Sequence, residues 1–344
     1  MDFLGQAPSV YAKIAFYQSL YKMRYYAATI QTDFPAPQSR SEIANRCEAM
    51  CTLIEQTVIG YEPFFDVRLF VLPEFGHQVP IYQTAKELHD KLAVELPNNY
   101  TEKYHKLCQK YGIYIQTASF IEKDKQYPGH VFNTTMLIGP GGILSKYRKV
   151  NTWIPWEVHT SPADLSNYHE PLFPVTDTEI GKLGVAICYD WLFPECIREI
   201  AFAGAEVINR VSAYMDPWGN TAPMEWWSLV NRTRALENTV YVVAANQGAS
   251  MQHYPPFSWP GGSMIVDFDG RILASAGESS GEKVVVAPID IAAIRLEKKR
   301  RQGHDTIAHY RQQAYGYQNN IKLDSESTIP TIETLNERIK HAKK

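Results

Sequence analysis

The segment that decides the fold runs Lys182-Leu-Gly-Val-Ala-Ile-Cys-Tyr-Asp-Trp-Leu-Phe-Pro-Glu195. It begins with an apolar run that is typical of a buried strand and turns at Cys188. A helix is expected over about 194–203, because proline stands at its start and Gly204 follows its end. Another apolar strand follows at 205–211. This strand–helix–strand order predicts a sheet covered by helices.

The rest of the chain adds both helical units and direct hairpins. Gly139-Pro-Gly-Gly142 and Asp269-Gly270 are turn signals between neighbouring apolar runs. Further strands are expected at 25–31, 67–72, 113–120, 131–138, 143–149, 240–246, 263–268, 271–276 and 283–289. Further helices are expected from 41 to about 58, over 99–111 and over 223–238. In the second of these helices, Asn99 is the expected cap and Gly112 the residue that ends it. The mixture predicts an α/β fold of packed mixed sheets with covering helices, not a strictly alternating barrel.

Both ends of the chain differ from its middle. Residues 1–23 contain apolar side chains at helical spacing and are expected to form a docking helix. From about residue 296 a basic cluster at 298–301 leads into a polar tail with one narrow apolar stripe. We therefore expect an N-terminal extension (1–23), one domain (24–295) and a C-terminal tail (296–344) that packs on its own body or on a second subunit.

Charge and cysteine content exclude several classes of protein. The 344 residues carry 34 Lys and Arg against 37 Asp and Glu, so no overall field attracts nucleic acid or an anionic membrane. The five cysteines contain no C-x-x-C pair, which argues against a disulfide framework and a zinc site. No apolar segment reaches the roughly 18 residues of a membrane span. A reducing cytoplasm is the expected location, without membrane insertion or secretion.

Cys188 is the sharpest candidate for chemistry. A thiol between a strand end and a helix lies close to backbone N–H groups, which favour a thiolate. The alternative is a small core residue. Cys47 and Cys51 lie four residues apart on one helix and are interpreted as core, as is Cys196. His77 is the one histidine near a strand end that could pair with a catalytic thiol, although a loop role is preferred.

Three charged residues complete a set of candidates. Glu74 ends a buried strand, Lys149 follows a hairpin strand, and Glu157 lies in a loop that contains two tryptophans. Taken singly, each has an ordinary interpretation as a cap, a surface ion pair or a solvated charge, and solvation is favoured for Lys146 and Arg148. The order of the set, a strand-end Glu, then a Lys, then a strand-end Cys, is what points to a site.

This order resembles the nitrilase superfamily of carbon–nitrogen hydrolases, whose catalytic triad is Glu-Lys-Cys. The matching segments are Leu72-Pro-Glu-Phe75, Lys146-Tyr-Arg-Lys-Val150 and Gly184 to Glu195, with further similarity at Asn133-Thr, Gly204-Ala-Glu, Arg234 to Asn246 and Gly262-Ser263. The resemblance covers about residues 24–290. It implies a four-layer α-β-β-α sandwich of mixed sheets that forms homodimers or larger homo-oligomers.

The resemblance also implies roles for individual residues. Cys188 is the nucleophile, Glu74 the general base and later acid, and Lys149 the cation beside the oxyanion. Glu157 is similar to the second glutamate of the aliphatic-amidase branch. The backbone N–H of Tyr189 would complete the oxyanion hole. No metal or organic cofactor is implied.

The residues after the cysteine favour one branch of that family. Tyr189-Asp190 stands where nitrile-cleaving members typically carry Trp-Glu, so the resemblance implies an amidase that acts on a small amide. Phe75, Trp153, Tyr189 and Tyr214 are the expected substrate-binding residues, and Trp156, Trp191 and Trp218 could join them or pack in the core. Two alternatives stay open: a nitrile-hydrolysing enzyme, and a catalytically silent assembly subunit, against which the intact set of four residues argues.

Overall fold

The computed structural model describes residues 23–34, 39–80, 82–153, 157–215, 225–249, 259–277, 281–301 and 303–315. The helix expected within residues 1–23 lies outside these ranges apart from Met23. The apolar stripe expected in the tail also lies outside them.

Two mixed sheets form the centre of the molecule. The first has the order β15-β1-β3-β4-β6-β5, with β7 also paired to β6, and the second has the order β14-β13-β11-β10-β9-β8. The strands of the first sheet are β1 (Arg24–Gln31), β3 (Val67–Val71), β4 (Tyr114–Gln116), β5 (Phe120–Lys123), β6 (Val131–Gly139), β7 (Gly142–Arg148) and β15 (Lys283–Asp290). Those of the second are β8 (Val175–Thr178), β9 (Gly181–Ile187), β10 (Val207–Ser212), β11 (Tyr241–Asn246), β13 (Met264–Val266) and β14 (Ile272–Ser275). Parallel pairs lie at the centre of each sheet and antiparallel pairs toward the edges, which confirms the predicted mixed sheets.

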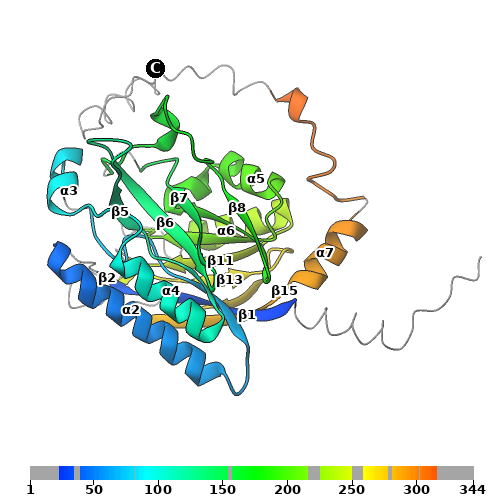
Figure 1. Cartoon of the computed structure of the whole chain (residues 1–344). Helices are drawn as coiled ribbons and strands as arrows, with labels where there is room; N and C mark the ends of the chain where they lie inside the picture. Colours follow the sequence, from blue (N-terminus) through cyan, green and yellow to red (C-terminus); the bar gives the residue numbers. More distant parts are fainter. Residues whose placement is uncertain are drawn as a thin grey trace, which may run out of the picture.

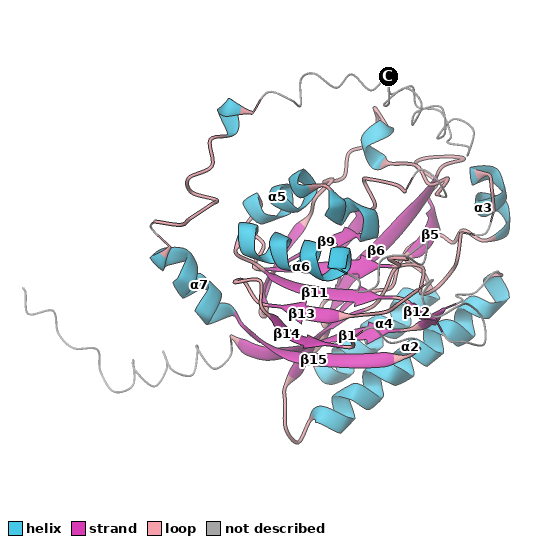
Figure 2. Ribbon diagram, turned by 180° about the vertical axis from the view of Figure 1, so that it is seen from behind, coloured by secondary structure: helices cyan, strands magenta, loops and turns pink. Residues whose placement is uncertain are grey.

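Helices cover the outer face of each sheet (Figures 1 and 2). Successive residues of β3 show the layering, because Leu69 packs between the sheets whereas Phe70 packs under the helices α2 (Arg40–Tyr61) and α4 (Asn99–Tyr111). Helices α5 (Pro194–Phe202) and α6 (Glu225–Asn238) lie against the second sheet. The expected four-layer α-β-β-α sandwich is therefore confirmed.

The predicted strand 113–120 is wrong as a single element. It forms β4 and β5, and the chain between them leaves the ladder to support the loop after β3. Ser119 donates its backbone N–H to the Pro73 carbonyl (3.3 Å), and its Oγ accepts from the Phe75 N–H (2.8 Å). The apolar pattern of the sequence does not reveal this detour, because the residues stay buried throughout it.

Smaller differences concern helix ends and short elements. The cap of α4 is Asn98, one residue before the expected position, and Gly112 ends the helix in the left-handed region (φ 64°) as expected. Four elements were not predicted from the sequence pattern: the helix α3 (Ala85–Lys91), the edge strand β8 and the paired strands β2 (Asp33–Phe34) and β12 (Gly248–Ala249). Helix α7 (Ile291–Arg300) follows β15 directly.

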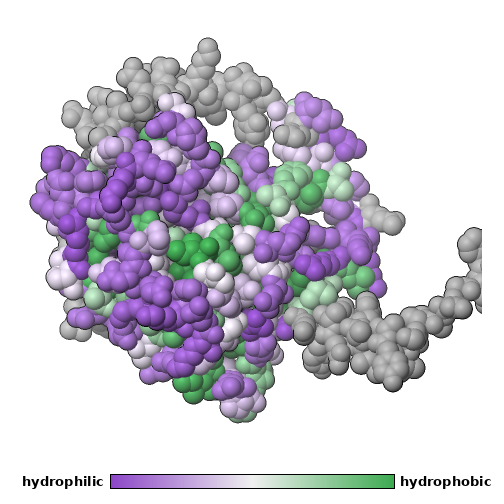
Figure 3. Space-filling model, in the orientation of Figure 1, coloured by the Kyte–Doolittle hydropathy of each residue, from purple (hydrophilic) through white to green (hydrophobic). Residues whose placement is uncertain are grey.

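The surface seen in Figure 3 is mainly hydrophilic, with separate apolar patches. The part of the chain that the structure describes contains no helix long and apolar enough to cross a bilayer. The five cysteines are free thiols, and four of them are buried.

Arg148, expected as a solvated charge, is instead fully buried at the end of β7. Its guanidinium donates to Glu122 (2.7 and 2.8 Å), Asp124 (2.5 Å) and Glu170 (3.2 Å), and it lies 4.3 Å from the ring centre of Phe132. Lys146, also expected in solvent, joins the same carboxylates and is mostly shielded. The pattern of β7 alone could not show this, because the carboxylates come from other strands and loops.

Arg148→Met is expected to destabilise the fold by about 3–5 kcal/mol, because it leaves the buried carboxylate of Glu122 without its main partner. Urea unfolding followed by circular dichroism measures this. The exposed Lys86→Met is the control, and the double variant with Glu122→Met should recover part of the loss. A loss below about 1 kcal/mol would show that the cluster contributes no more than a surface pair.

Candidate active site

Loops at the carboxyl ends of strands from both sheets bring the candidate residues together. Glu74 follows β3 of the first sheet, and Cys188 directly follows β9 of the second. The backbone joins the sheets here, since the N–H of Glu74 donates to the carbonyl of Ser212 at the end of β10 (3.2 Å). The side chain of Gln247 donates to the Glu74 carbonyl (2.8 Å). The position of Glu74 therefore depends on both sheets.

Lys149 lies between two carboxylates. Its Nζ donates to Oε1 of Glu74 (2.8 Å) and to Oε1 and Oε2 of Glu157 (2.9 and 2.8 Å). All three side chains are nearly inaccessible to water. Buried charges need partners of this kind to be tolerated, so the arrangement keeps the ammonium group charged and fixed in place.

Asn133 is a functional candidate whose role the sequence pattern does not reveal. Its Nδ2 donates to Oε1 of Glu74 (2.8 Å) and to Oε1 of Glu157 (3.2 Å), and its carbonyl accepts from the backbone N–H of Lys149 (2.8 Å). The sequence singles out the Asn133-Thr pair, but it does not show which residues Asn133 contacts. Two backbone groups complete the carboxylates: the N–H of Ala213 donates to Glu74 (2.9 Å) and that of Trp153 to Glu157 (2.6 Å).

Cys188 lies on a tight turn between β9 and a short 3₁₀ helix (Cys188–Leu192). Its φ of 45° is uncommon for a residue with a side chain, and Phe75, next to Glu74, has a φ of 54°. Asp190 holds the turn: it accepts from the N–H groups of Ile187 (3.0 Å) and Asn151 (2.7 Å) and from the Tyr147 hydroxyl (2.7 Å). Such strained positions are typical of functional sites.

Cys188 shares one cavity with Glu74, Lys149 and Glu157. The cavity has a volume of about 320 Å³ and is otherwise lined by Phe75, Trp153, Tyr189, Leu192, Arg210, Ala213, Tyr214, Met215 and Trp226. The expected pocket residues Phe75, Trp153, Tyr189 and Tyr214 are all among them. Trp191 is not: it is buried in the core and donates to the Ala186 carbonyl (3.1 Å). Trp156 and Trp218 lie outside the described residues.

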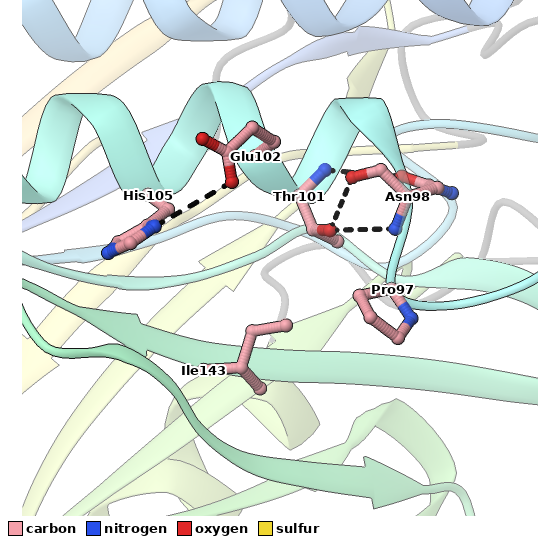
Figure 4. Close-up of a pocket in the computed structure, with 6 residues that line it drawn as sticks. All are labelled: Pro97, Asn98, Thr101, Glu102, His105 and Ile143. Atoms are coloured by element: carbon pink, nitrogen blue, oxygen red, sulfur yellow. Dashed lines mark hydrogen bonds and ion pairs between the residues drawn. The ribbon is translucent and has the colours of Figure 1, made fainter.

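A second hollow, of about 360 Å³, lies at the start of α4 (Figure 4). Its polar groups are engaged locally, since Asn98 caps the helix and His105 pairs with Glu102. No cysteine lines this hollow. Volume alone does not separate the two cavities, but the side chains that line them do.

Burial and neighbouring charges shift the pKa values of the two glutamates of the site in opposite directions. Burial raises the pKa of Glu74, opposed by Lys149 and reinforced by the charge of Glu157. Burial acts on Glu157 in the same direction, but Lys149 and His159 outweigh it and lower its pKa. For Lys149, burial lowers the pKa, and the attraction of Glu157 and Glu74 overcomes this to raise it. Burial and the charge of Glu74 raise the pKa of Cys188 to about 12. Glu74 is thus suited to exchange a proton, while Glu157 stays ionised.

The raised pKa of Glu74 predicts the acid limb of the pH profile. If the carboxylate of Glu74 must accept a proton, activity falls as pH decreases through its pKa, which lies above the ordinary 4.5. We therefore expect kcat/KM for a neutral substrate to reach half its maximum above pH 4.5. Rate measurements between pH 4 and 8 test this, with circular dichroism at each pH to show that the protein stays folded. A midpoint at or below 4.5 would contradict the assignment.

Other candidates from the sequence do not join the site. His77 is buried in the core, where its ring nitrogens lie 2.8 Å from the Tyr104 hydroxyl and 3.2 Å from the Ser119 carbonyl, so it is not a partner of Cys188. Cys47 and Cys51 are core residues of α2, as predicted. Among the described residues, no group of three or more His, Cys, Asp or Glu side chains could hold a metal ion.

Comparisons with known proteins agree with this geometry. A family model described as carbon–nitrogen hydrolase matches residues 27–299. A formamidase of Bacillus cereus (strain Q1) is 31% identical over 267 residues, which are 77% of this chain and 74% of the relative. Among solved structures, the chain is similar to Nit3 of Saccharomyces cerevisiae, which is described as a member of branch 10 of the nitrilase superfamily. The TM-score is 0.66 at 24% identity, and the match covers 85% of this chain and 97% of the Nit3 chain. An amidase from Nesterenkonia sp. has a TM-score of 0.63 at 19% identity, and the match covers 86% of this chain and 96% of the amidase chain.

Proposed function

Because the chain belongs to the carbon–nitrogen hydrolase family, we propose that it hydrolyses the amide bond of a small molecule, with Cys188 as the nucleophile. The observation that carries the proposal is the shared cavity of Cys188, Glu74, Lys149 and Glu157. The similarity to a formamidase supports an amide as the substrate.

The first half of the proposed reaction forms a thioester. Glu74 accepts the proton of the Cys188 thiol, and the sulfur attacks the amide carbonyl carbon. The carbonyl oxygen becomes an oxyanion, which Lys149 and the backbone N–H of Tyr189 stabilise. Protonated Glu74 then gives its proton to the amide nitrogen, the C–N bond breaks, and ammonia or an amine leaves.

The hydrogen bonds of Lys149 suggest how it takes part. In the resting site its Nζ makes three contacts with carboxylate oxygens, which accounts for its three N–H groups. When Glu74 takes up the thiol proton, it becomes a weaker acceptor for Lys149. One N–H group is then available for the oxyanion, at the step at which that charge forms.

The second half releases the acid. Glu74 removes a proton from a water molecule, and the resulting hydroxide attacks the thioester carbonyl. The carboxylic acid leaves, and the sulfur of Cys188 takes back a proton from Glu74. Glu157, whose pKa is lowered, stays ionised and holds Lys149 in place through both halves.

The cavity favours a small, mainly apolar acyl group. Its volume of about 320 Å³ is at the lower end of ligand pockets, and Phe75, Trp153, Tyr214 and Trp226 provide aromatic walls. We expect rates to fall as the acyl chain of the amide lengthens.

Ammonia release tests the proposed function. The panel comprises formamide, acetamide, propionamide, butyramide, a carbamoyl compound and the matching nitriles, with Cys188→Ala as the blank. We expect ammonia from the short amides and a thioester of the acyl group on Cys188, detected by mass spectrometry after acid quenching. Ammonia from nitriles alone would favour a nitrile-hydrolysing enzyme. No turnover with an unreactive Cys188 would favour a silent subunit.

We further propose that the chain forms homo-oligomers. Helix α6 exposes Trp226, Leu229 and Leu236, with exposed fractions of 60, 58 and 51%, and α5 exposes Phe202. An apolar helix face of this kind is typical of a subunit interface. Light scattering after size exclusion tests this: Leu229→Glu should shift the mass to that of a smaller species, and a monomeric wild type would contradict it.

A further inference from the structure

Arg210 is a buried cation that the mechanism above does not use. It lies on β10, its side chain is almost inaccessible to water, and it lines the same cavity as Cys188. Lysine and arginine are rarely buried without a compensating partner. The groups around this guanidinium therefore indicate which negative charge it balances.

The protein partners of Arg210 are neutral. Its Nη1 donates to Oδ1 of Asn231 (2.8 Å), and its guanidinium lies 4.1 Å from the ring centre of Trp227 and 5.3 Å from that of Trp191. Its Nε is buried and has no hydrogen-bond partner among the described residues. Within the part of the chain that the structure describes, no carboxylate forms an ion pair with it. Arg148, by comparison, contacts three carboxylates.

Charge balance points to the cavity. Two ionised glutamates and one ammonium group leave the cluster of Glu74, Lys149 and Glu157 with one net negative charge. When the thiol proton moves to Glu74, the cluster becomes neutral and the sulfur of Cys188 carries the negative charge. Among the described residues that line the cavity, Arg210 supplies the one further positive charge, and its attraction acts on the thiolate in the same direction as that of Lys149.

We propose that Arg210 is the cation that stabilises the negative charge on the Cys188 sulfur when the thiol gives up its proton, an inference that rests on the proposed thiol mechanism. The ionisable groups that act on the thiol are Glu74, Lys149 and Arg210, and those that act on Arg210 are Cys188, Tyr214, Arg234 and Glu74. Lys149 keeps the carboxylate of Glu157 as a partner after Glu74 is protonated, whereas no carboxylate among the described residues pairs with Arg210, so the field of Arg210 reaches the sulfur with less compensation.

Thiol reactivity tests the inference without turnover. The rate of Cys188 alkylation by iodoacetamide is measured from pH 6 to 10 by peptide mass spectrometry, for the wild type and for Arg210→Met, Arg210→Lys and the control Lys86→Met. Because loss of a nearby opposite charge shifts a pKa by about 1–3 units, Arg210→Met should slow alkylation at pH 8 by at least about tenfold. Arg210→Lys should recover most of the rate, and Lys86→Met should match the wild type.

A second variant keeps Arg210 in place. Asn231→Asp puts a carboxylate at the atom that now accepts from Nη1 and so compensates the guanidinium. It should also slow alkylation, whereas the uncharged Asn231→Leu should slow it less. If Arg210→Met does not fold, the comparison of Asn231→Asp with Asn231→Leu tests the role of Arg210 in its place.

Different failures can be told apart. An unchanged alkylation profile in Arg210→Met, or in Asn231→Asp if the former does not fold, would overturn the inference. If that profile were unchanged while KM rose only for amides that carry a carboxylate, Arg210 would bind substrate instead. If the wild type released no ammonia from any amide, the proposed function would fail, whatever the alkylation rates.

Discussion

Replacing Cys188 with alanine should reduce kcat for amide hydrolysis at least about 10⁴-fold, because none of the other described residues that line the cavity is a cysteine that could form the thioester. The fold should hardly change. Alanine and cysteine meet the same backbone restriction at a φ of 45°, and the change removes one sulfur atom that lines a cavity. Ammonia release measures the activity, and thermal unfolding measures the stability.

Cys51→Ala is the matched control for this experiment, because Cys51 is a buried thiol in the core beneath α2. It should keep its activity within about twofold. Residual hydrolysis by Cys188→Ala above about 1% of wild type, in protein free of wild-type contamination, would contradict the role of the thiol. Cys188→Gly offers a further check: glycine tolerates the positive φ, so this variant should be inactive and at least as stable as Cys188→Ala.

Lys149→Met is expected to have two large effects. It removes the cation beside the oxyanion, which should lower kcat/KM by about 10²–10³-fold or more. It also leaves the buried carboxylates of Glu74 and Glu157 facing each other without a counter-ion, which should destabilise the fold by about 3–5 kcal/mol at pH 7. Steady-state rates and urea unfolding measure the two effects.

The stability effect of Lys149→Met should depend on pH in a defined direction. Without Lys149, the pKa values of both carboxyl groups rise in the folded state, so the penalty is present at neutral pH. It should shrink as pH falls and the groups take up protons. A penalty that stayed constant between pH 7 and 5 would contradict this account. Lys149→Arg, which keeps the charge but changes its shape, should retain more stability than activity.

Much of the sandwich could be predicted from local patterns. The apolar runs of β3, β9 and β11 and the glycine turn between β6 and β7 were all located from sequence, because burial on both faces leaves an uninterrupted apolar signature. Glu74 and Cys188 were found because each follows such a strand at or close to its end, and Lys149 was found because it follows the hairpin strand β7 in the order of the set. Their placement in one cavity agrees with that expectation.

The remainder depended on contacts between distant segments. Arg148 was expected in solvent, but Glu122, Asp124 and Glu170 surround it from other parts of the chain. The break between β4 and β5 follows from the bonds that Ser119 makes to the loop after β3. Neither feature changes the local apolar pattern, so neither could be predicted from it.

The attachment of Glu74 to both sheets has a consequence for thermal inactivation. Its N–H group is tied to Ser212 and its carboxylate to Ala213, next to the end of β10, whereas the peptide carrying it continues from β3. A slight separation of the two sheets would move the proton acceptor relative to the thiol before any strand melted. Activity should therefore be lost at a lower temperature than the secondary structure that far-ultraviolet circular dichroism measures. Mutations that tighten the packing between the sheets should reduce the difference between these two temperatures.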